Sequence, residues 1–277
     1  MLKQRVITAI GLALLFLGVL FYLSVIGFAI AIAVVVLLAS WEWANMAGLK
    51  AQGQRLLYVL GVGVAMALTG WYVDFWAGDV LDGSSVRTVL LVACTWWAVA
   101  LLWVQGYPSS SVLWAHPLVK IVMGLLVLVP TWLSLVFLRG EPSGEWLILL
   151  VVLVVVCADI GAYFSGKTFG KRKLAPEVSP GKSWEGFWGG FICCLLLALV
   201  VGFTFGGGWL LLAVIAPTAL ASVLGDLLES MVKRQRGLKD SSQLLPGHGG
   251  ILDRVDSITA AAPVFSLAIL LSGLNFQ

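Results

Sequence analysis

The sequence predicts an all-α polytopic membrane protein with about nine transmembrane helices. Three observations lead to this fold class. Hydrophobic residues make up 60% of the 277 residues, charged residues make up only 11%, and the mean hydropathy is +1.01. Long apolar runs follow one another along the chain, and basic residues collect between alternate runs. A soluble domain of this length would carry far more surface charge.

The apolar runs have the length that a membrane helix needs, which is about 20 residues. They span residues 5–24, 26–47, 54–73, 86–105, 118–138, 145–165, 185–205, 209–232 and 253–274. Lys3 and Arg5 precede the first run as in a signal peptide, but no clear small-residue cleavage site separates this run from the second. We therefore expect the first run to be a retained helix.

The basic residues predict how the helices are oriented. With about nine spans, fifteen of the seventeen Lys and Arg residues fall on the face that holds the N-terminus, and only Arg87 and Arg139 fall opposite. Because cytoplasmic loops are enriched in Lys and Arg, this face is predicted to be cytoplasmic and the C-terminus to lie outside. Nine of the fifteen lie in two loops, 166–184 and 233–252.

The polar chemistry is concentrated in the C-terminal part of the chain. We accordingly divide the chain into an N-terminal membrane region of five spans, 1–140, and a C-terminal region of four spans and two long loops, 141–277. The N-terminal region has little polar chemistry apart from Glu42, in the sequence WEW.

Two pairs of acidic residues face each other across the second loop. Asp226 and Glu229 are three residues apart on the eighth span and so share a helical face, and Asp253 and Asp256 repeat this spacing at the start of the ninth. Carboxylates suit magnesium, which is usually held by one or two of them together with substrate phosphates. In the alternative, the acids cap the ninth helix and pair with nearby bases. Those bases are Lys233, Arg234 and Arg254.

The second loop also contains a glycine cluster, Pro-Gly-His-Gly-Gly, at residues 246–250. Gly249 and Gly250 allow backbone N–H groups to approach phosphate oxygens, and a helix start adds its dipole. With Lys239 and the other bases of the loop, the segment offers charge and backbone donors to a polyphosphate. No second histidine lies near His248 in sequence, which argues against a zinc site. His248 is therefore expected either to bind phosphate or to have a structural role.

The first loop and the run before it contain a second set of candidates. Asp159 lies within the sixth apolar run, where an ionisable group is by default a functional hypothesis; a proton relay or an ion pair with a basic loop residue remains open. The polar candidates after it are Lys167, Ser179, Lys182 and Ser183. Residues 161–168 match the P-loop expression, but the match begins within a membrane helix, whereas a P-loop follows a strand.

The segment from Ser230 to Asp256, SMVKRQRGLKDSSQLLPGHGGILDRVD, resembles the signature of the phosphatidate cytidylyltransferases, or CDP-diacylglycerol synthases. The stretch ADIGAYFSGKTFGKRKLAPEVSPGKSWEGFWGG is similar to a second block of that family, with Ser183 where threonine is expected. The resemblance extends over the whole chain in length and span pattern.

The resemblance implies synthesis of CDP-diacylglycerol and pyrophosphate from CTP and phosphatidic acid. Catalysis is expected from Asp226, Asp253, Lys239 and Lys182. Substrate binding is expected from Lys167, Ser179, Ser183, Lys233, Arg234, His248, Gly249, Gly250 and Arg254. Mg²⁺ is expected at Asp226, Asp253, Asp256, Glu229 and Asp159, with a second cation such as K⁺ left open.

The resemblance also implies a homodimer in a bacterial inner (cytoplasmic) membrane, with the active site facing the cytoplasm and no nucleic-acid partner. Two other functions are kept as alternatives. An ion-coupled transporter would use Asp159, Asp226 and Asp253 along a path through the membrane. A CTP-dependent lipid kinase would transfer the terminal phosphate and release CDP in place of pyrophosphate.

Overall fold

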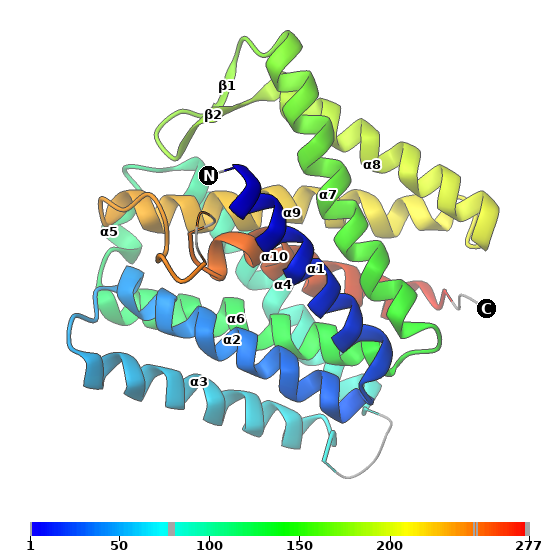
Figure 1. Ribbon diagram of the computed structural model, residues 1–277, viewed down its shortest axis with the longest axis horizontal. Coiled ribbons are helices and arrows are strands. Elements are labelled where there is room, and N and C mark those ends of the chain that lie inside the picture. Colours follow the sequence, from blue (N-terminus) through cyan, green and yellow to red (C-terminus); the bar gives the residue numbers. More distant parts are fainter. Residues whose placement is uncertain (1, 77–80, 246, 248, 275–277) are drawn as a thin grey trace.

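The computed structural model describes residues 2–76, 81–245, 247 and 249–274. The helices are α1 (Leu2–Tyr22), α2 (Val25–Ala47), α3 (Gln52–Tyr72), α4 (Gly83–Gln105), α5 (Ser111–Trp114), α6 (Pro117–Gly140), α7 (Gly144–Phe169), α8 (Trp184–Phe205), α9 (Leu210–Gln235) and α10 (Leu252–Ser272). Two strands, β1 (Lys173–Ala175) and β2 (Ser179–Ser183), lie between α7 and α8. Figure 1 shows the long helices assembled into one bundle.

The all-α polytopic fold is confirmed. Within the described residues, eight helices are long and apolar enough to cross a membrane, and α1 adds a shorter apolar segment, Ile7–Tyr22. Each of the predicted runs corresponds to one of these helices, with ends that differ by a few residues. Two elements were not predicted from sequence, the single turn α5 and the hairpin of β1 and β2 within loop 166–184.

The hairpin is antiparallel, with Lys173 opposite Ser183 and Ala175 opposite Ser179. The backbone N–H of Trp184 donates to Arg172 O at 2.9 Å, so α8 starts directly where the hairpin closes. Periodicity could not reveal strands this short, because they contain glycine, proline and lysine in place of an apolar alternation.

In Figure 1, helices α2, α3, α6, α9 and α10 lie roughly along the longest axis of the molecule, whereas α1, α7 and α8 cross it obliquely. Both long loops lie in the half of the molecule where α1 begins, whereas α10 ends at the opposite side. This alternation agrees with the order expected from about nine crossings. Which end faces the cytoplasm stays a prediction.

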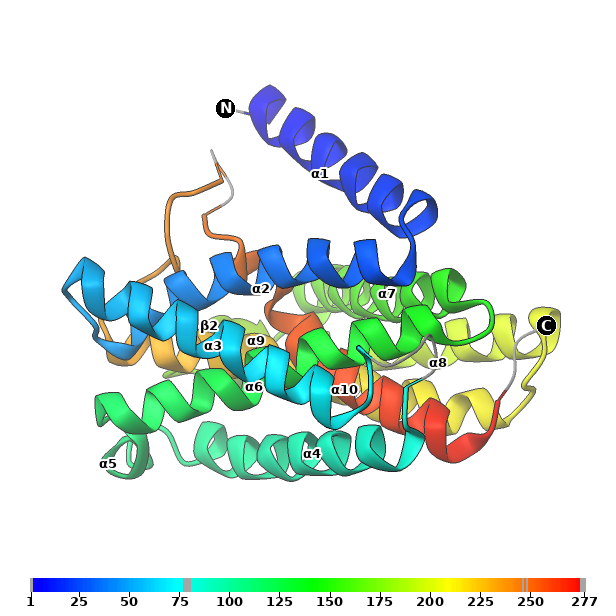
Figure 2. The ribbon, with the colours of Figure 1, turned by 90° about the horizontal axis from the view of Figure 1, so that it is seen from below.

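Helix α6 lies at the centre of the bundle and packs against α2, α3, α4 and α10. Two side chains of α6 make polar contacts with other helices, since Thr131 Oγ1 donates to Thr259 O at 3.0 Å and Trp132 Nε1 donates to Ala29 O at 3.0 Å. Figure 2 shows α1 diverging from the rest of the bundle. Its Leu14 and Leu15 are each 64% exposed, as suits side chains that face lipid.

Helices α7 and α8 pack closely through glycines at the end that adjoins the hairpin. A Cβ on Gly161 would lie 2.9 Å from Gly189 O, and a Cβ on Gly186 would lie 2.9 Å from Ala162 O. Small residues of this kind let membrane helices approach backbone to backbone. The close approach fixes where the hairpin sits relative to both helices.

Candidate active site at the hairpin and the start of α10

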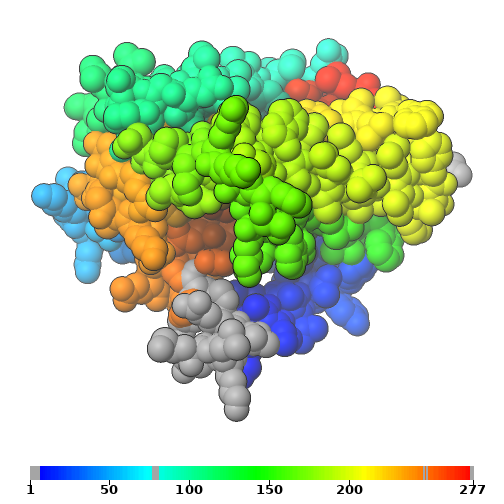
Figure 3. Space-filling view, turned by 90° about the horizontal axis from the view of Figure 1, so that it is seen from above, coloured from blue at the N-terminus to red at the C-terminus, as the bar shows by residue number. Residues whose placement is uncertain are grey.

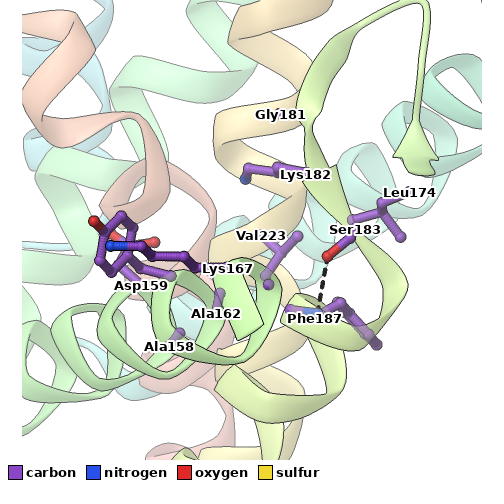
Figure 4. Close-up of a pocket in the computed structure, with 13 residues that line it drawn as sticks. Ala158, Asp159, Ala162, Lys167, Leu174, Gly181, Lys182, Ser183, Phe187 and Val223 are labelled. Atoms are coloured by element: carbon purple, nitrogen blue, oxygen red, sulfur yellow. Dashed lines mark hydrogen bonds between the residues drawn. The ribbon is translucent and has the colours of Figure 1, made fainter. Parts of the chain in front are cut away.

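A cavity of about 370 Å³ lies where the hairpin meets α7 and α8. Its lining includes Asp159 and Lys167 from α7, Lys182 and Ser183 from the hairpin, and Val223 from α9. Figure 4 shows these side chains around the space, with Asp159 and Lys167 on α7 and Lys182 and Ser183 on the opposite side. The cavity therefore joins residues of the first long loop to an ionisable group of the sixth predicted run.

An ion pair connects this cavity to α9. Lys182 Nζ lies 2.5 Å from Asp226 Oδ2, and each side chain is 27% exposed. Asp226 Oδ1 accepts a hydrogen bond of 3.2 Å from Ser230 Oγ. Asp159 is close enough to interact electrostatically with both Lys182 and Asp226. Two acids and one base from three separate elements thus share one polar region.

A second charged cluster is centred on Lys233. Its Nζ lies 2.6 Å from Asp253 Oδ1 and 3.0 Å from Glu229 Oε1, and all three side chains are less than a tenth exposed. Asp253 also accepts hydrogen bonds from the N–H groups of Ser241, at 2.9 Å, and Gly250, at 2.8 Å. The alternative that these acids pair with loop bases is thus the arrangement found for Asp253 and Glu229.

Asp256 lies between the two clusters. It interacts electrostatically with Asp226 and Lys182 on one side and with Lys233 on the other. Helices α9 and α10 are in close contact here. A Cβ on Gly225 of α9 would clash with the backbone O of Asp256 in α10. Figure 3 shows the first turn of α10 set back between the 236–245 segment and the end of α7. The four acids predicted to converge do converge.

The carboxylates are arranged for an open magnesium site, completed by water and substrate, and not for a site closed by protein ligands alone. Among the described residues, no three His, Cys, Asp or Glu side chains surround a point where a metal ion could bind. Magnesium keeps waters and substrate phosphates among its ligands and needs only one or two carboxylates. Asp226 and Asp159, which adjoin the cavity, suit that role, whereas Asp253 would first have to give up Lys233 or Ser241.

The basic residues do not all converge in the structure. Lys167 and Lys182 line the same cavity, and Lys167 Nζ lies 5.8 Å from the centre of the Tyr163 ring. Arg234 instead ties α9 to the hairpin, since its Nε donates to Val178 O at 3.3 Å. Lys239 is exposed and lies outside the cavity lining, and Arg254 is exposed on α10.

The predicted serine and glycine residues have structural roles in this conformation. Ser183 Oγ caps α8 by accepting the Gly186 N–H at 3.1 Å, and Ser179 pairs with Ala175 in the hairpin. Gly249 has a φ of +79°, which favours glycine. The Gly250 N–H already donates to Asp253. His248 lies outside the described residues.

One polar residue in contact with the second loop was not among the candidates from sequence. Glu42 of α2 is 1% exposed and accepts hydrogen bonds from four donors of the second loop and the start of α10. Those donors are Ser241 Oγ (3.2 Å), Ser242 Oγ (2.5 Å), Ile251 N (3.0 Å) and Leu252 N (2.7 Å). An acidic residue within an apolar run was the feature that could have identified it.

The structure also bears on two rejected or alternative functions. Residues 161–168, which match the P-loop expression, lie within α7, and α6 precedes that helix. A transporter would need polar groups along its outer half, but the cavity of about 600 Å³ between the far halves of α7 and α8 is lined by apolar residues apart from Ser143. The structure therefore favours neither a P-loop nucleotide hydrolase nor a transporter.

A protein-family model described as "Cytidylyltransferase family" matches residues 3–272. The chain belongs to the cytidylyltransferase family. It is 48% identical to a phosphatidate cytidylyltransferase of Pseudomonas aeruginosa, over 99% of this chain and 98% of that protein. Proteins of the same name from Haemophilus influenzae and Staphylococcus haemolyticus are 45% and 33% identical, over 96% and 97% of this chain and 98% and 99% of theirs.

These comparisons confirm the resemblance found in the segment from Ser230 to Asp256. The matches cover nearly the whole chain, so both charged clusters and the helices that carry them belong to the shared family region. Membership of this family identifies the chain as a nucleotidyltransferase embedded in a membrane. The lipid-kinase and transporter alternatives have no support among these relatives.

Proposed function

We propose that the chain is a phosphatidate cytidylyltransferase, which makes CDP-diacylglycerol and pyrophosphate from CTP and phosphatidate for phospholipid synthesis. The observation that carries the proposal is the cavity at the hairpin, where Lys167 and Lys182 offer positive charge beside Asp159 and the Lys182–Asp226 pair. The names of relatives that are up to 48% identical support the same substrates.

The proposed reaction is a displacement at the α-phosphorus of CTP. A phosphate oxygen of phosphatidate forms the new P–O bond, and the bond from that phosphorus to the bridging oxygen breaks, so that the electron pair leaves with pyrophosphate. A phosphomonoester is already an anion at neutral pH, so the nucleophile needs no strong base. The main requirement is to bring two anions together in line, and positive charge supplies this.

The chain's own residues divide this work. Lys167 and Lys182 are placed to neutralise phosphate oxygens in the cavity. Asp226 orients Lys182 through the ion pair, and Asp159 and Asp256 provide carboxylates near that pair. We propose that Mg²⁺ binds among these carboxylates and the substrate phosphates, where it would neutralise developing charge. A second cation such as K⁺ remains part of the hypothesis.

The location of the substrates indicates which end of the helix bundle faces the cytoplasm. We propose that the hairpin end faces the cytoplasm of a bacterial-type inner membrane, because CTP is a cytoplasmic nucleotide and most basic loop residues lie at this end. Phosphatidate would enter from the adjoining bilayer.

We also propose a homodimer, as the family resemblance implies, and crosslinking of the purified protein in detergent would test it.

The test is an assay of the purified chain with CTP, phosphatidate and magnesium. The proposal expects one pyrophosphate released for each CDP-diacylglycerol formed, and no turnover when phosphatidate is left out. Release of CDP as the nucleotide product would instead indicate a lipid kinase. Phosphatidate-independent hydrolysis of CTP would also contradict the proposal.

A further inference from the structure

Glu42 is a buried acid at the far end of the sequence from the residues that it contacts. It lies near the end of α2, within the sequence WEW, and is 1% exposed. Its four hydrogen-bond donors are all about 200 residues away in sequence. A buried carboxylate is costly unless such donors satisfy it. The contact is therefore a specific link between α2 and the second long loop.

Each carboxylate oxygen of Glu42 accepts two of these bonds. Oε1 accepts from Ser242 Oγ and Ile251 N, and Oε2 accepts from Ser241 Oγ and Leu252 N. The two backbone donors belong to the start of α10, where N–H groups have no partner within the helix. A negative charge at a helix N-terminus is also favoured by the helix dipole. Glu42 thus holds the start of α10 from outside that helix.

Ser241 connects Glu42 to the charged cluster around Lys233. Its hydroxyl shares one hydrogen between Glu42 Oε2, at 3.2 Å, and Asp253 Oδ2, at 2.9 Å, and its backbone N–H also donates to Asp253. Asp253 in turn pairs with Lys233 at 2.6 Å. A continuous chain of polar contacts therefore runs from α2 through the loop to two residues of the candidate active site.

Glu42 and Ser241 approach the backbone at Gly250 closely. A Cβ on Gly250 would lie 2.6 Å from Glu42 Oε1 and 2.7 Å from Oε2, and it would also strike Ser241 Oγ. Only glycine allows Glu42 to approach the backbone while the Gly250 N–H donates to Asp253. The glycine at this position is therefore explained by the contact with Glu42, independently of any phosphate.

We infer that Glu42 is a positioning residue for cytidylyl transfer, which acts through Ser241 and the start of α10 to hold Asp253 and Lys233 beside the Asp256 carboxylate. The inference rests on the proposed function. It assigns a role at the active site to a residue of the N-terminal region, whereas the candidate site residues named above come from the C-terminal region. Glu42 itself does not touch substrate in this account.

The test compares Glu42→Gln and Ser241→Ala with the unaltered full-length chain in detergent or vesicles. An amide at residue 42 places NH₂ hydrogens against one of the two backbone N–H donors, so that at least one of these bonds is lost. We expect kcat per folded molecule to fall roughly tenfold to a hundredfold, the range for a lost hydrogen bond to a charged group. Glu145→Gln is the control, because Glu145 pairs with Arg139 at the opposite end of the molecule.

Two further measurements separate positioning from general stability. Folded protein is quantified by size-exclusion chromatography, and amide hydrogen exchange is measured without substrate. Glu42→Gln should speed exchange in peptides that cover 241–253 and leave those of α7 and α8 unchanged. Because both residues act through one network, the double variant should be no slower than Glu42→Gln alone.

The inference is overturned if kcat per folded molecule is unchanged in Glu42→Gln, or if the two substitutions slow the reaction by independent factors. A loss of folded protein with normal kcat would likewise show a purely structural role. If Glu42→Gln does not fold, Ser241→Ala still decides the matter through its own kcat and exchange. Failure of the unaltered chain to form CDP-diacylglycerol would refute the proposed function instead.

Discussion

Lys182 Nζ lies 2.5 Å from Asp226 Oδ2, and this ion pair joins strand β2 to helix α9 at the edge of the cavity. The two residues are far apart in sequence, and the whole of α8 separates the strand of one from the helix of the other. The pair is part-exposed, so that a substrate phosphate can compete with Asp226 for the lysine. It is the contact on which the first predictions depend.

Lys182→Ala should lower kcat/KM for cytidylyl transfer roughly tenfold to a hundredfold, since a charge-assisted hydrogen bond to phosphate contributes about 1.5–3 kcal/mol. Steady-state kinetics with both substrates varied is the measurement. Lys171→Ala is a suitable control, because Lys171 is exposed in the same loop and does not line the cavity. Equal kinetic constants for Lys182→Ala and the unaltered chain would remove Lys182 from the site.

Asp226→Asn should abolish turnover while the protein still inserts and folds, because the change removes a negative charge from both the ion pair and the expected magnesium site. Removal of magnesium with a chelator should likewise stop the unaltered enzyme, and added magnesium should restore it. Near-normal rates for Asp226→Asn at saturating magnesium would contradict the assignment.

Gly161→Ala should destabilise the contact of α7 with α8, because the new Cβ would lie 2.9 Å from Gly189 O and Gly190 Cα. Overpacking of this kind typically costs about 1–3 kcal/mol. Thermal unfolding in detergent should show a lower Tm than for the unaltered chain. Gly53→Ala is the control, since a Cβ there meets no atom within 4 Å; an equal Tm for both variants would refute the account of this interface.

Single cysteines at the two ends of α7 should react with a membrane-impermeant thiol reagent from opposite sides. Lys171→Cys, beyond the hairpin end of α7, should be labelled only from the cytoplasm, and Glu141→Cys, before its other end, only from outside. The four native cysteines lie within helices and serve as the background in the unaltered chain. Labelling of both new cysteines from one side would overturn the proposed topology.

The helices were predictable because each apolar run has the length of a membrane span, and the runs correspond to helices within a few residues. The hairpin was not, since Lys173–Ala175 and Ser179–Ser183 have no strand-like alternation and depend on packing against α7 and α8. Spacing places the two acids of each pair on one helical face, and the structure brings the pairs together, with Asp226 near Asp256.

The partners that those acids find in other segments could not be predicted from spacing. The i,i+4 spacing of Glu229 and Lys233 on α9 is compatible with their pair, but only the folded loop shows that Lys233 also contacts Asp253. Glu42 was visible as an isolated acid in an apolar run, but its donors lie about 200 residues away. Contacts over such separations are set by how α2 and α10 pack, which no local pattern encodes.

The most direct test of the account follows two labels in one reaction. CTP labelled at the α-phosphate, and in a parallel sample at the γ-phosphate, is incubated with the purified chain, phosphatidate and magnesium, and the lipid is extracted. The account predicts that the α-label enters the lipid and that the γ-label remains in the aqueous phase as pyrophosphate. Transfer of the γ-label to the lipid, or no phosphatidate-dependent transfer of the α-label, would contradict it.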